Sequence, residues 1–151
     1  LENYQKGECK TMKVTIKQVQ GLTFVGKGES NHWVSIDGPV QFNGSEAGSR
    51  PMELLLISLG SCTGSDVASI LQKKRVPVDT MEVIVTGERE ETHPKVYTKI
   101  DIQYTFYGKN METKDLERAI DLSQNKYCPI SAMLKDTCEI THSFEIKEKN
   151  E

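Results

Sequence analysis

Two of the four cysteines in this chain, Cys62 and Cys128, have sequence surroundings in which a thiol could do chemistry. Cys62 lies among small and hydroxyl-bearing residues in the run Gly60–Asp66, and Cys128 directly precedes Pro129. A reactive thiol needs polar surroundings that stabilise the thiolate, and backbone N–H groups at a helix start favour nearby negative charge. If the two sulfurs met, one could attack an oxidant and the other could resolve the sulfenic acid to a disulfide. Because buried free cysteines often act as small hydrophobic residues, a structural role is the alternative for each.

Asp66 follows Cys62 by four residues, so the two side chains share a face if this segment is helical. A carboxylate at that place would raise the pKa of the thiol, which opposes a reactive thiolate. Asp66 could instead hold a cation such as Arg50 or Lys126. The simpler alternative is a bond to the backbone or to another subunit.

The other candidate residues are better explained by packing. Cys138 and His142 share the apolar face of a predicted strand, Thr137–Lys147, which favours a core or interface position. Cys9 lies in a polar segment and is expected to be a loose thiol. His32 could line a pocket, but a place on an edge strand is favoured, and His93 lies at a predicted hairpin tip. Tyr127 could form a wall of the site beside Cys128 or simply pack there.

The element that must position Cys62 is a predicted helix over Pro51–Lys74. Proline suits a first helical position, and the basic residues that close the run complement the helix C-terminus. The apolar residues are not confined to one stripe, which is typical of a buried helix. Glycine costs about 1 kcal/mol relative to alanine inside a helix, so Gly60 and Gly64 require a reason. Either they permit close packing of another helix, or they clear space around Cys62.

The remaining segments are predicted to form strands and two further helices. Alternation of apolar and polar residues predicts the following strands: Met12–Lys17, Leu22–Lys27, His32–Ile36, Thr80–Glu90, Val96–Tyr107 and Thr137–Lys147. One helix is predicted from an N-cap at Thr113 to about Lys126, and a short one over Ile130–Leu134. The loop Asn43–Arg50 is expected to be mobile unless a partner orders it. Runs of strands separated by helices indicate an α+β fold with antiparallel sheets.

Composition narrows the class of protein. With 151 residues, the chain is predicted to form one domain, with residues 1–10 as a loose lead-in. The net charge of −3 argues against a nucleic-acid partner. The apolar segment Leu54–Leu59 is far shorter than the roughly 18 residues that a membrane span needs. The first thirty residues carry no secretion signal, and the cysteine spacing signals neither a clustered zinc site nor a disulfide scaffold. We therefore expect a cytoplasmic protein with reduced thiols.

Three stretches of the sequence resemble the OsmC/Ohr family, most of all its YhfA-like branch. They are RPMELLL at 50–56, LGSCTGSDV at 59–67 and SQNKYCPIS at 123–131. The predicted order of elements is similar as well, so the resemblance covers nearly all of the chain after about residue 12. It implies an OsmC-like fold: an intertwined homodimer in which long buried central helices pack together with sheets outside. A helix that is apolar on nearly every side also favours a dimer, because one sheet covers only one side of it.

The resemblance also implies an activity. Well-known members of the family are thiol peroxidases that reduce organic hydroperoxides. Cys62 resembles the peroxidatic cysteine and Cys128 the resolving one. An external dithiol, of lipoyl type in the Ohr members, would reduce the resulting disulfide, so no bound cofactor or metal is expected.

The sequence departs from the family at the residues that activate the thiolate. Ohr proteins use an Arg after a pair of glycines in the N-terminal strands, whereas this chain has Lys27 there. They also carry a Glu directly after the Pro, a place held here by Met52, with Glu53 one residue later. The pair is therefore either rebuilt as Arg50–Glu53 or absent. If it is absent, the thiolate is scarce, which favours the alternative of a non-catalytic redox-sensing or ligand-binding protein.

Overall fold

The computed structural model describes residues 11–148, and the chain forms two compact units, one up to Leu54 and one from Leu55 onward. The first unit contains an antiparallel sheet of three strands in the order β1-β2-β3: Thr15–Gln20, Thr23–Lys27 and Val34–Ile36. The three strands predicted in this part of the chain are therefore confirmed, with the first beginning at Thr15 instead of Met12. A short 3-10 helix, η1 (Val40–Phe42), follows β3.

Asp37 organises the loop that follows the first sheet. Its side chain is 2% exposed. The carboxylate accepts hydrogen bonds from the Thr23 hydroxyl at 2.9 Å and from the backbone N–H groups of Gly38, Ser45 and Ala47 at 2.7, 3.2 and 3.1 Å. The loop predicted to be mobile is thus held by one buried carboxylate of its own unit.

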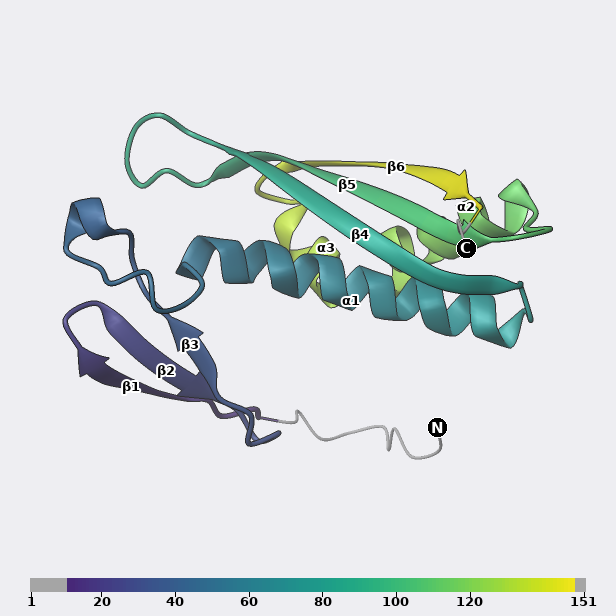
Figure 1. The fold of residues 1–151 in the computed structure, drawn as a ribbon. Helices are drawn as coiled ribbons and strands as arrows, with labels where there is room; N and C mark the ends of the chain where they lie inside the picture. The colour runs from purple at the N-terminus through teal and green to yellow at the C-terminus, as the bar shows by residue number, and fades with distance from the viewer. Residues whose placement is uncertain (1–10, 149–151) are drawn as a thin grey trace. The chain divides into compact units, whose positions relative to one another are not determined.

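The second unit is built from α1 (Pro51–Lys73, which begins in the first unit), β4 (Val78–Arg89), β5 (Tyr97–Gly108), α2 (Thr113–Leu122), the π-helix η2 (Ser123–Tyr127), α3 (Pro129–Leu134) and β6 (Glu139–Lys147). Its sheet has the order β4-β5-β6. Figure 1 shows α1, α2 and α3 on one face of this sheet. The α+β class and the element order are as predicted.

One strand pairing differs from the prediction of antiparallel sheets. β4 and β5 form an antiparallel hairpin, but β6 pairs with β5 in parallel, with Ile100 opposite Ile140 and Phe106 opposite Ile146. The chain crosses from β5 to β6 through α2, η2 and α3. Such a long crossover lets the chain return to the starting end of the sheet, which a tight hairpin cannot do.

The core of the second unit lies between β5 and the helices. Alternation predicts one apolar face from Val96 to Phe106. Val96 precedes β5 and is 47% exposed, whereas four residues of this face are fully buried: Ile100, Ile102, Tyr104 and Phe106. From the helices they meet a set of fully buried apolar residues: Leu59, Val67, Leu116 and Ala119.

The central helix α1 is buried along one side only, whereas the sequence predicts burial nearly all round. Leu59 and Val67 are fully buried, but Ile57 is 55% exposed. By length and composition alone, α1 could cross a membrane, which a count of uninterrupted apolar residues misses. The core helix of a soluble protein passes the same test, and one side of α1 packs against its own sheet.

Gly60 and Gly64 serve close packing between α1 and β4. A Cβ added at Gly60 would lie 2.8 Å from a methyl carbon of Val85, and one at Gly64 would lie 3.4 Å from a methyl carbon of Val83. Of the two explanations that the sequence left open, close packing holds, but the expectation of a second helix was wrong, because the element packed against both glycines is the strand β4.

Candidate active site

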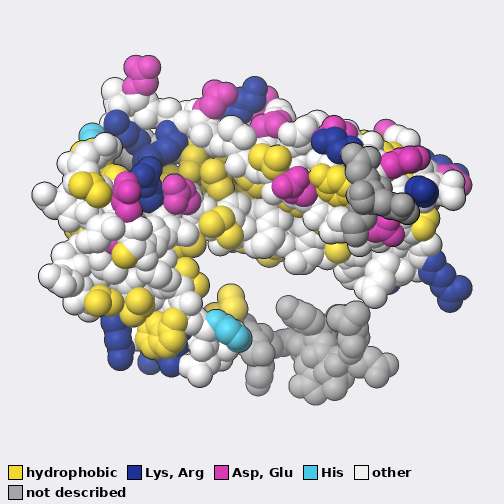
Figure 2. All heavy atoms as spheres, viewed as in Figure 1, with side chains coloured by type: hydrophobic (Ala, Val, Ile, Leu, Met, Phe, Trp, Pro, Cys, Tyr) yellow, Lys and Arg dark blue, Asp and Glu magenta, His cyan; other side chains and the backbone are white. Residues whose placement is uncertain are grey.

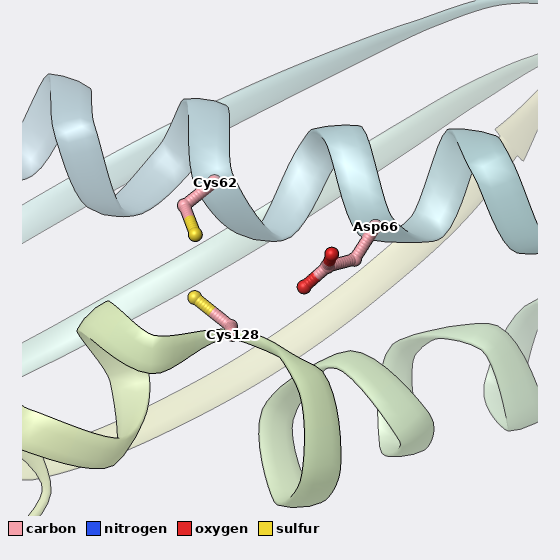
Figure 3. A group of neighbouring side chains, drawn as sticks. All are labelled: Cys62, Asp66 and Cys128. Carbon is pink, nitrogen blue, oxygen red and sulfur yellow. The ribbon is translucent and has the colours of Figure 1, made fainter. Parts of the chain in front are cut away.

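Folding brings together three side chains that could do chemistry. Cys62 and Asp66 project from successive turns of α1, and Cys128 faces them from the junction of η2 and α3 (Figure 3). The two sulfurs and a carboxylate oxygen of Asp66 all lie within 4.8 Å of one another. Both cysteines are free thiols. Cys62 is partly exposed and Cys128 is 2% exposed, so an incoming molecule reaches Cys62 more readily.

Local backbone structure fixes the position of Cys128. The predicted helix from Thr113 to Lys126 ends as an α-helix at Leu122 and widens into the π-helix η2, and its N-cap is Glu112 instead of Thr113. The Cys128 backbone N–H donates to the Ser123 carbonyl at 2.9 Å. The Cys128 side chain caps α3 by accepting from the Ser131 backbone N–H at 3.4 Å. Single-turn π segments are frequent at functional sites, and here one turns the chain immediately before a thiol.

A buried network of hydroxyl and amide groups lies beneath the cysteines. Thr63 Oγ1 lies 2.5 Å from the Tyr104 hydroxyl and 2.8 Å from Ser123 Oγ. Gln124 Nε2 donates to both Thr63 and Tyr104, at 2.9 and 3.0 Å. Ser131 donates to Gln124 Oε1 at 3.1 Å. The network therefore joins α1, β5, η2 and α3 around the site.

The donors of this network can be ordered in one direction. Ser123 donates its one hydroxyl proton to Asp66 Oδ2 at 3.1 Å, so Thr63 must donate to Ser123 and Tyr104 must then donate to Thr63. This series of hydrogen bonds ends at the carboxylate of Asp66, which can only accept hydrogen bonds when it is ionised. The partner of Asp66 is thus a serine side chain of its own chain, and neither of the two sequence-based alternatives anticipated it.

The electrostatic surroundings disfavour the Cys62 thiolate. The pKa of the Cys62 thiol is raised from 9.0 to about 11, chiefly by burial and further by Cys128 and the charge of Asp66. A hydrogen bond from the backbone N–H of Ile130 lowers it. These influences come from a thiol, a carboxylate and a backbone amide, and within residues 11–148 they include no lysine or arginine. Burial is also the main cause that raises the pKa of the Tyr104 hydroxyl.

Arg50 and Glu53, which are predicted to activate the thiolate, interact with each other. The Arg50 backbone N–H donates to Glu53 Oε2 at 2.9 Å, and the Arg50 Nε atom lies 3.9 Å from Glu53 Oε1. Both side chains are about half exposed. A carboxylate three residues after the N-cap position is one half of a capping box, so the pair has a structural role at the start of α1.

Two further sequence candidates, Lys126 and Cys138, have contacts of their own. Lys126 Nζ lies 5.4 Å from the centre of the Tyr127 ring. Cys138 is buried, with its sulfur 3.4 Å from the Leu134 carbonyl oxygen, as the packing explanation predicts. Cys9 lies outside the described residues. Sequence reasoning missed Thr63, Tyr104 and Gln124, although a tyrosine on the inward face of β5 signals a buried hydroxyl that needs a partner.

Comparison with known proteins places the chain among proteins of one fold. Residues 43–143 match the family described as OsmC-like protein. The chain is similar to Protein YhfA of Escherichia coli strain K12, with 39% identity over 135 residues that cover 89% of this chain and 98% of the relative. A hypothetical protein from Aquifex aeolicus VF5 has a similar structure, with a TM-score of 0.82 and 38% identity, covering 93% of this chain and 99% of that one. An organic hydroperoxide resistance protein from Elizabethkingia anophelis shares the fold at a TM-score of 0.69 and 13% identity, covering 93% and 99% of the two chains.

Proposed function

From the premise that this chain belongs to the OsmC-like protein family, we propose that it is a thiol-dependent peroxidase that reduces organic or small hydroperoxides. One observation carries the proposal. Two free thiols from distant parts of the chain lie within 4.8 Å of each other, one of them partly exposed and the other buried behind it. That arrangement suits an attacking thiol and a resolving thiol.

The proposed reaction has two steps on the protein. The Cys62 thiolate attacks the terminal peroxide oxygen, the O–O bond breaks, and the alcohol leaves with a proton, which makes Cys62 a sulfenic acid. The Cys128 thiol then attacks the Cys62 sulfur, a disulfide forms, and water leaves. An external dithiol, which we propose to be of lipoyl type, returns both thiols by exchange. We place this chemistry in the cytoplasm, where a reducing pool keeps thiols available.

The proposal assigns the chemistry to Cys62 and Cys128. Arg50 and Glu53 remain a sequence-based prediction as site residues. Their mutual pairing at the start of α1 gives them another reason to be there.

Mass spectrometry after a stoichiometric dose of tert-butyl hydroperoxide tests this function. We expect the reduced protein to lose two hydrogens and its peptide map to show a Cys62–Cys128 disulfide. Cys62→Ser should abolish peroxide consumption, and Cys128→Ser should leave a sulfenic acid that dimedone traps. Cys138→Ser is the matched control and should behave as the wild type. Peroxide consumption that survives Cys62→Ser would remove the proposal.

A second candidate function has its own support. The pKa of Cys62, raised to about 11, leaves about one thiol in 10,000 ionised at pH 7. A site with so little thiolate suits a small-ligand binding protein, or a redox sensor that responds slowly, without rapid turnover. Comparing the rate at which a hydroperoxide oxidises Cys62 with the rate for free cysteine separates the two. An equal or slower rate favours the sensor or binding protein.

We also propose that the protein is a homodimer. An open groove of about 590 Å³ runs between α1 and β4, lined by apolar and small residues that include Leu56, Ile57, Gly60 and Val85. Figure 2 shows hydrophobic side chains at the surface among acidic and basic ones. A second copy of α1 would cover this groove, because small residues let two helices approach closely. Sedimentation equilibrium should give twice the chain mass of 17.0 kDa, and Ser61→Glu, on the exposed lining of the groove, should shift it to the monomer.

A further inference from the structure

The three side chains of the candidate site are also a set of metal ligands. Two cysteine sulfurs and a carboxylate oxygen, all within 4.8 Å of one another, point toward a common centre (Figure 3). In a tetrahedral zinc site the Zn–S distance is about 2.3 Å and the Zn–O distance about 2.1 Å, so ligand atoms lie roughly 3.5–3.8 Å apart. Side-chain rotations that move atoms by about 1 Å close the present separation to that value.

The donor types select the class of ion. Two thiolates and one carboxylate suit a soft or borderline dication such as Zn²⁺, whereas Mg²⁺ and Ca²⁺ prefer sites built wholly from oxygen. Cys62 and Asp66 are partly exposed, so an ion can enter from solvent. We propose that the reduced protein binds one thiophilic divalent cation through Cys62 Sγ, Cys128 Sγ and a carboxylate oxygen of Asp66.

The surroundings of the three ligands support this assignment. Ligating carboxylates in proteins are themselves held by hydrogen bonds, and Ser123 Oγ holds Asp66 Oδ2 at 3.1 Å. The Cys128 sulfur accepts from the Ser131 backbone N–H, an interaction that suits a thiolate ligand. None of the ion pairs found among residues 11–148 involves Asp66, so a bound dication would be its charge partner.

Metal binding and disulfide formation exclude each other at this site. When a hydroperoxide accepts two electrons from the two thiolates, the products are a disulfide, the free dication, an alcohol and water, with two protons taken from solvent. The bound ion would therefore shield the thiols, and oxidation would release it. The site needs only reduced cysteines to bind the ion, so this inference stands apart from the proposed peroxidase activity.

Zinc binding to the reduced, chelator-stripped full chain tests the inference, with Cys9→Ser as the background. Competition against a chromophoric chelator should give one Zn²⁺ per chain, and Co²⁺ should give a thiolate-to-metal charge-transfer absorption. Cys62→Ser or Cys128→Ser should weaken binding at least 100-fold and Asp66→Asn at least tenfold. Cys138→Ser, at a buried cysteine outside the cluster, is the matched control and should leave binding unchanged.

A chemical control guards against variants that fold poorly. The unsubstituted protein, oxidised to the disulfide and freed of oxidant, should lose Zn²⁺ binding and regain it after reduction. Binding that persists after oxidation or in Cys62→Ser, or a stoichiometry near zero, overturns the inference. If the protein binds no Zn²⁺ but still forms the Cys62–Cys128 disulfide, only the proposed metal site is overturned. If it binds Zn²⁺ but forms no disulfide, only the proposed peroxidase activity is overturned.

Discussion

At the scale of single residues, the carboxylate of Asp66 works against the thiolate of Cys62. Their charges repel, and the pKa of Cys62 is raised to about 11 chiefly by burial, with Cys128 and Asp66 adding to the effect. An ionised thiol next to this carboxylate is therefore unfavourable in the metal-free protein. A peroxidase built on this site would speed up as the pH rises.

Asp66→Asn should make Cys62 more reactive. Removing the negative charge lowers the pKa of the thiol, so the thiolate fraction at a fixed pH increases, while the amide oxygen still accepts from Ser123. We expect iodoacetamide to alkylate Cys62 about two- to tenfold faster at pH 8 in chelator-treated protein. The wild-type rate should rise tenfold per pH unit up to about pH 10. The same rate in both proteins would show that the charge of Asp66 does not reach the sulfur.

Thr63→Val should destabilise the second unit. Thr63 is fully buried and bonds to Tyr104, Ser123 and Gln124, so the substitution keeps the shape and leaves buried partners unsatisfied. An unsatisfied buried polar group costs about 1–3 kcal/mol. Urea unfolding followed by circular dichroism measures the change. Thr98→Val is the matched control, because Thr98 bonds at the surface and should change stability by less than about 0.5 kcal/mol.

At the scale of elements, the contact between α1 and β4 depends on the absence of one side chain. Gly60→Ala would place a Cβ 2.8 Å from a methyl group of Val85, a β-branched residue that is stiff at χ1. Overpacking of this kind costs about 1–3 kcal/mol, against about 1 kcal/mol gained in helix propensity. Gly64→Ala meets only an ordinary contact at 3.4 Å and should be neutral or stabilising. Thermal unfolding should therefore rank Gly64→Ala above Gly60→Ala, and Val85→Ala should rescue the latter. Equal effects at the two glycines would contradict this account.

The local patterns of the sequence predict these elements well, and their connections less well. Alternation marks the buried face of β5 correctly, because Ile100, Ile102 and Phe106 repeat with the period of a strand. The alternation of apolar and polar residues could not predict the parallel pairing of β6, because parallel and antiparallel strands alternate with the same period. The π-helix η2 was predicted as α-helix, because the inward positions, such as Ser123, fit both. The chemistry of Asp66 depends on that same serine, 57 residues away.

The site itself was predicted by resemblance and not by spacing. Nothing in the residues alone shows that Cys62 and Cys128 meet, because the crossover from β5 to β6 sets their proximity. The similarity to the OsmC/Ohr family supplied the pairing of the two cysteines. The network of Thr63, Tyr104 and Gln124 escaped both approaches, since its members are polar residues scattered over separate elements.

At the scale of the whole molecule, the chain divides into two compact units, and the buried apolar residues found among residues 11–148 all lie in the second. In the first unit the buried carboxylate of Asp37 accepts hydrogen bonds from Thr23 and from the loop that follows the sheet. Burial has the largest single effect and raises the pKa of Asp37, but hydrogen bonds from Gly38, Ala47, Thr23 and Ser45 together hold it below the ordinary value of 3.8. The ionised form is thus favoured by folding.

The stability of the first unit should fall in acid. Because the folded pKa of Asp37 is lower than the unfolded one, its contribution is fully present above about pH 4 and is lost as the pH falls through the folded pKa. The single tryptophan, Trp33, lies in this unit, so its fluorescence reports the unfolding locally. Asp37→Asn should lower the urea midpoint at pH 7 and remove much of the acid dependence below pH 4. An acid dependence identical to that of the wild type would assign the effect to another group.

The parallel pairing of β6 with β5 affects how Cys62 and Cys128 come together in a newly made chain. Ile140 pairs with Ile100, so closing the sheet joins positions 40 residues apart in the chain, and α2, η2 and α3 lie inside the loop that is closed. Contacts between such distant positions form slowly, because the entropy of the loop is lost before the contact is gained. During synthesis Cys62 emerges well before Cys128, and it stays a solitary thiol until this loop is in place. A ribosome-bound chain that stops before β6 should therefore react faster with thiol reagents at Cys62 than the finished protein, in which burial raises the pKa of that thiol.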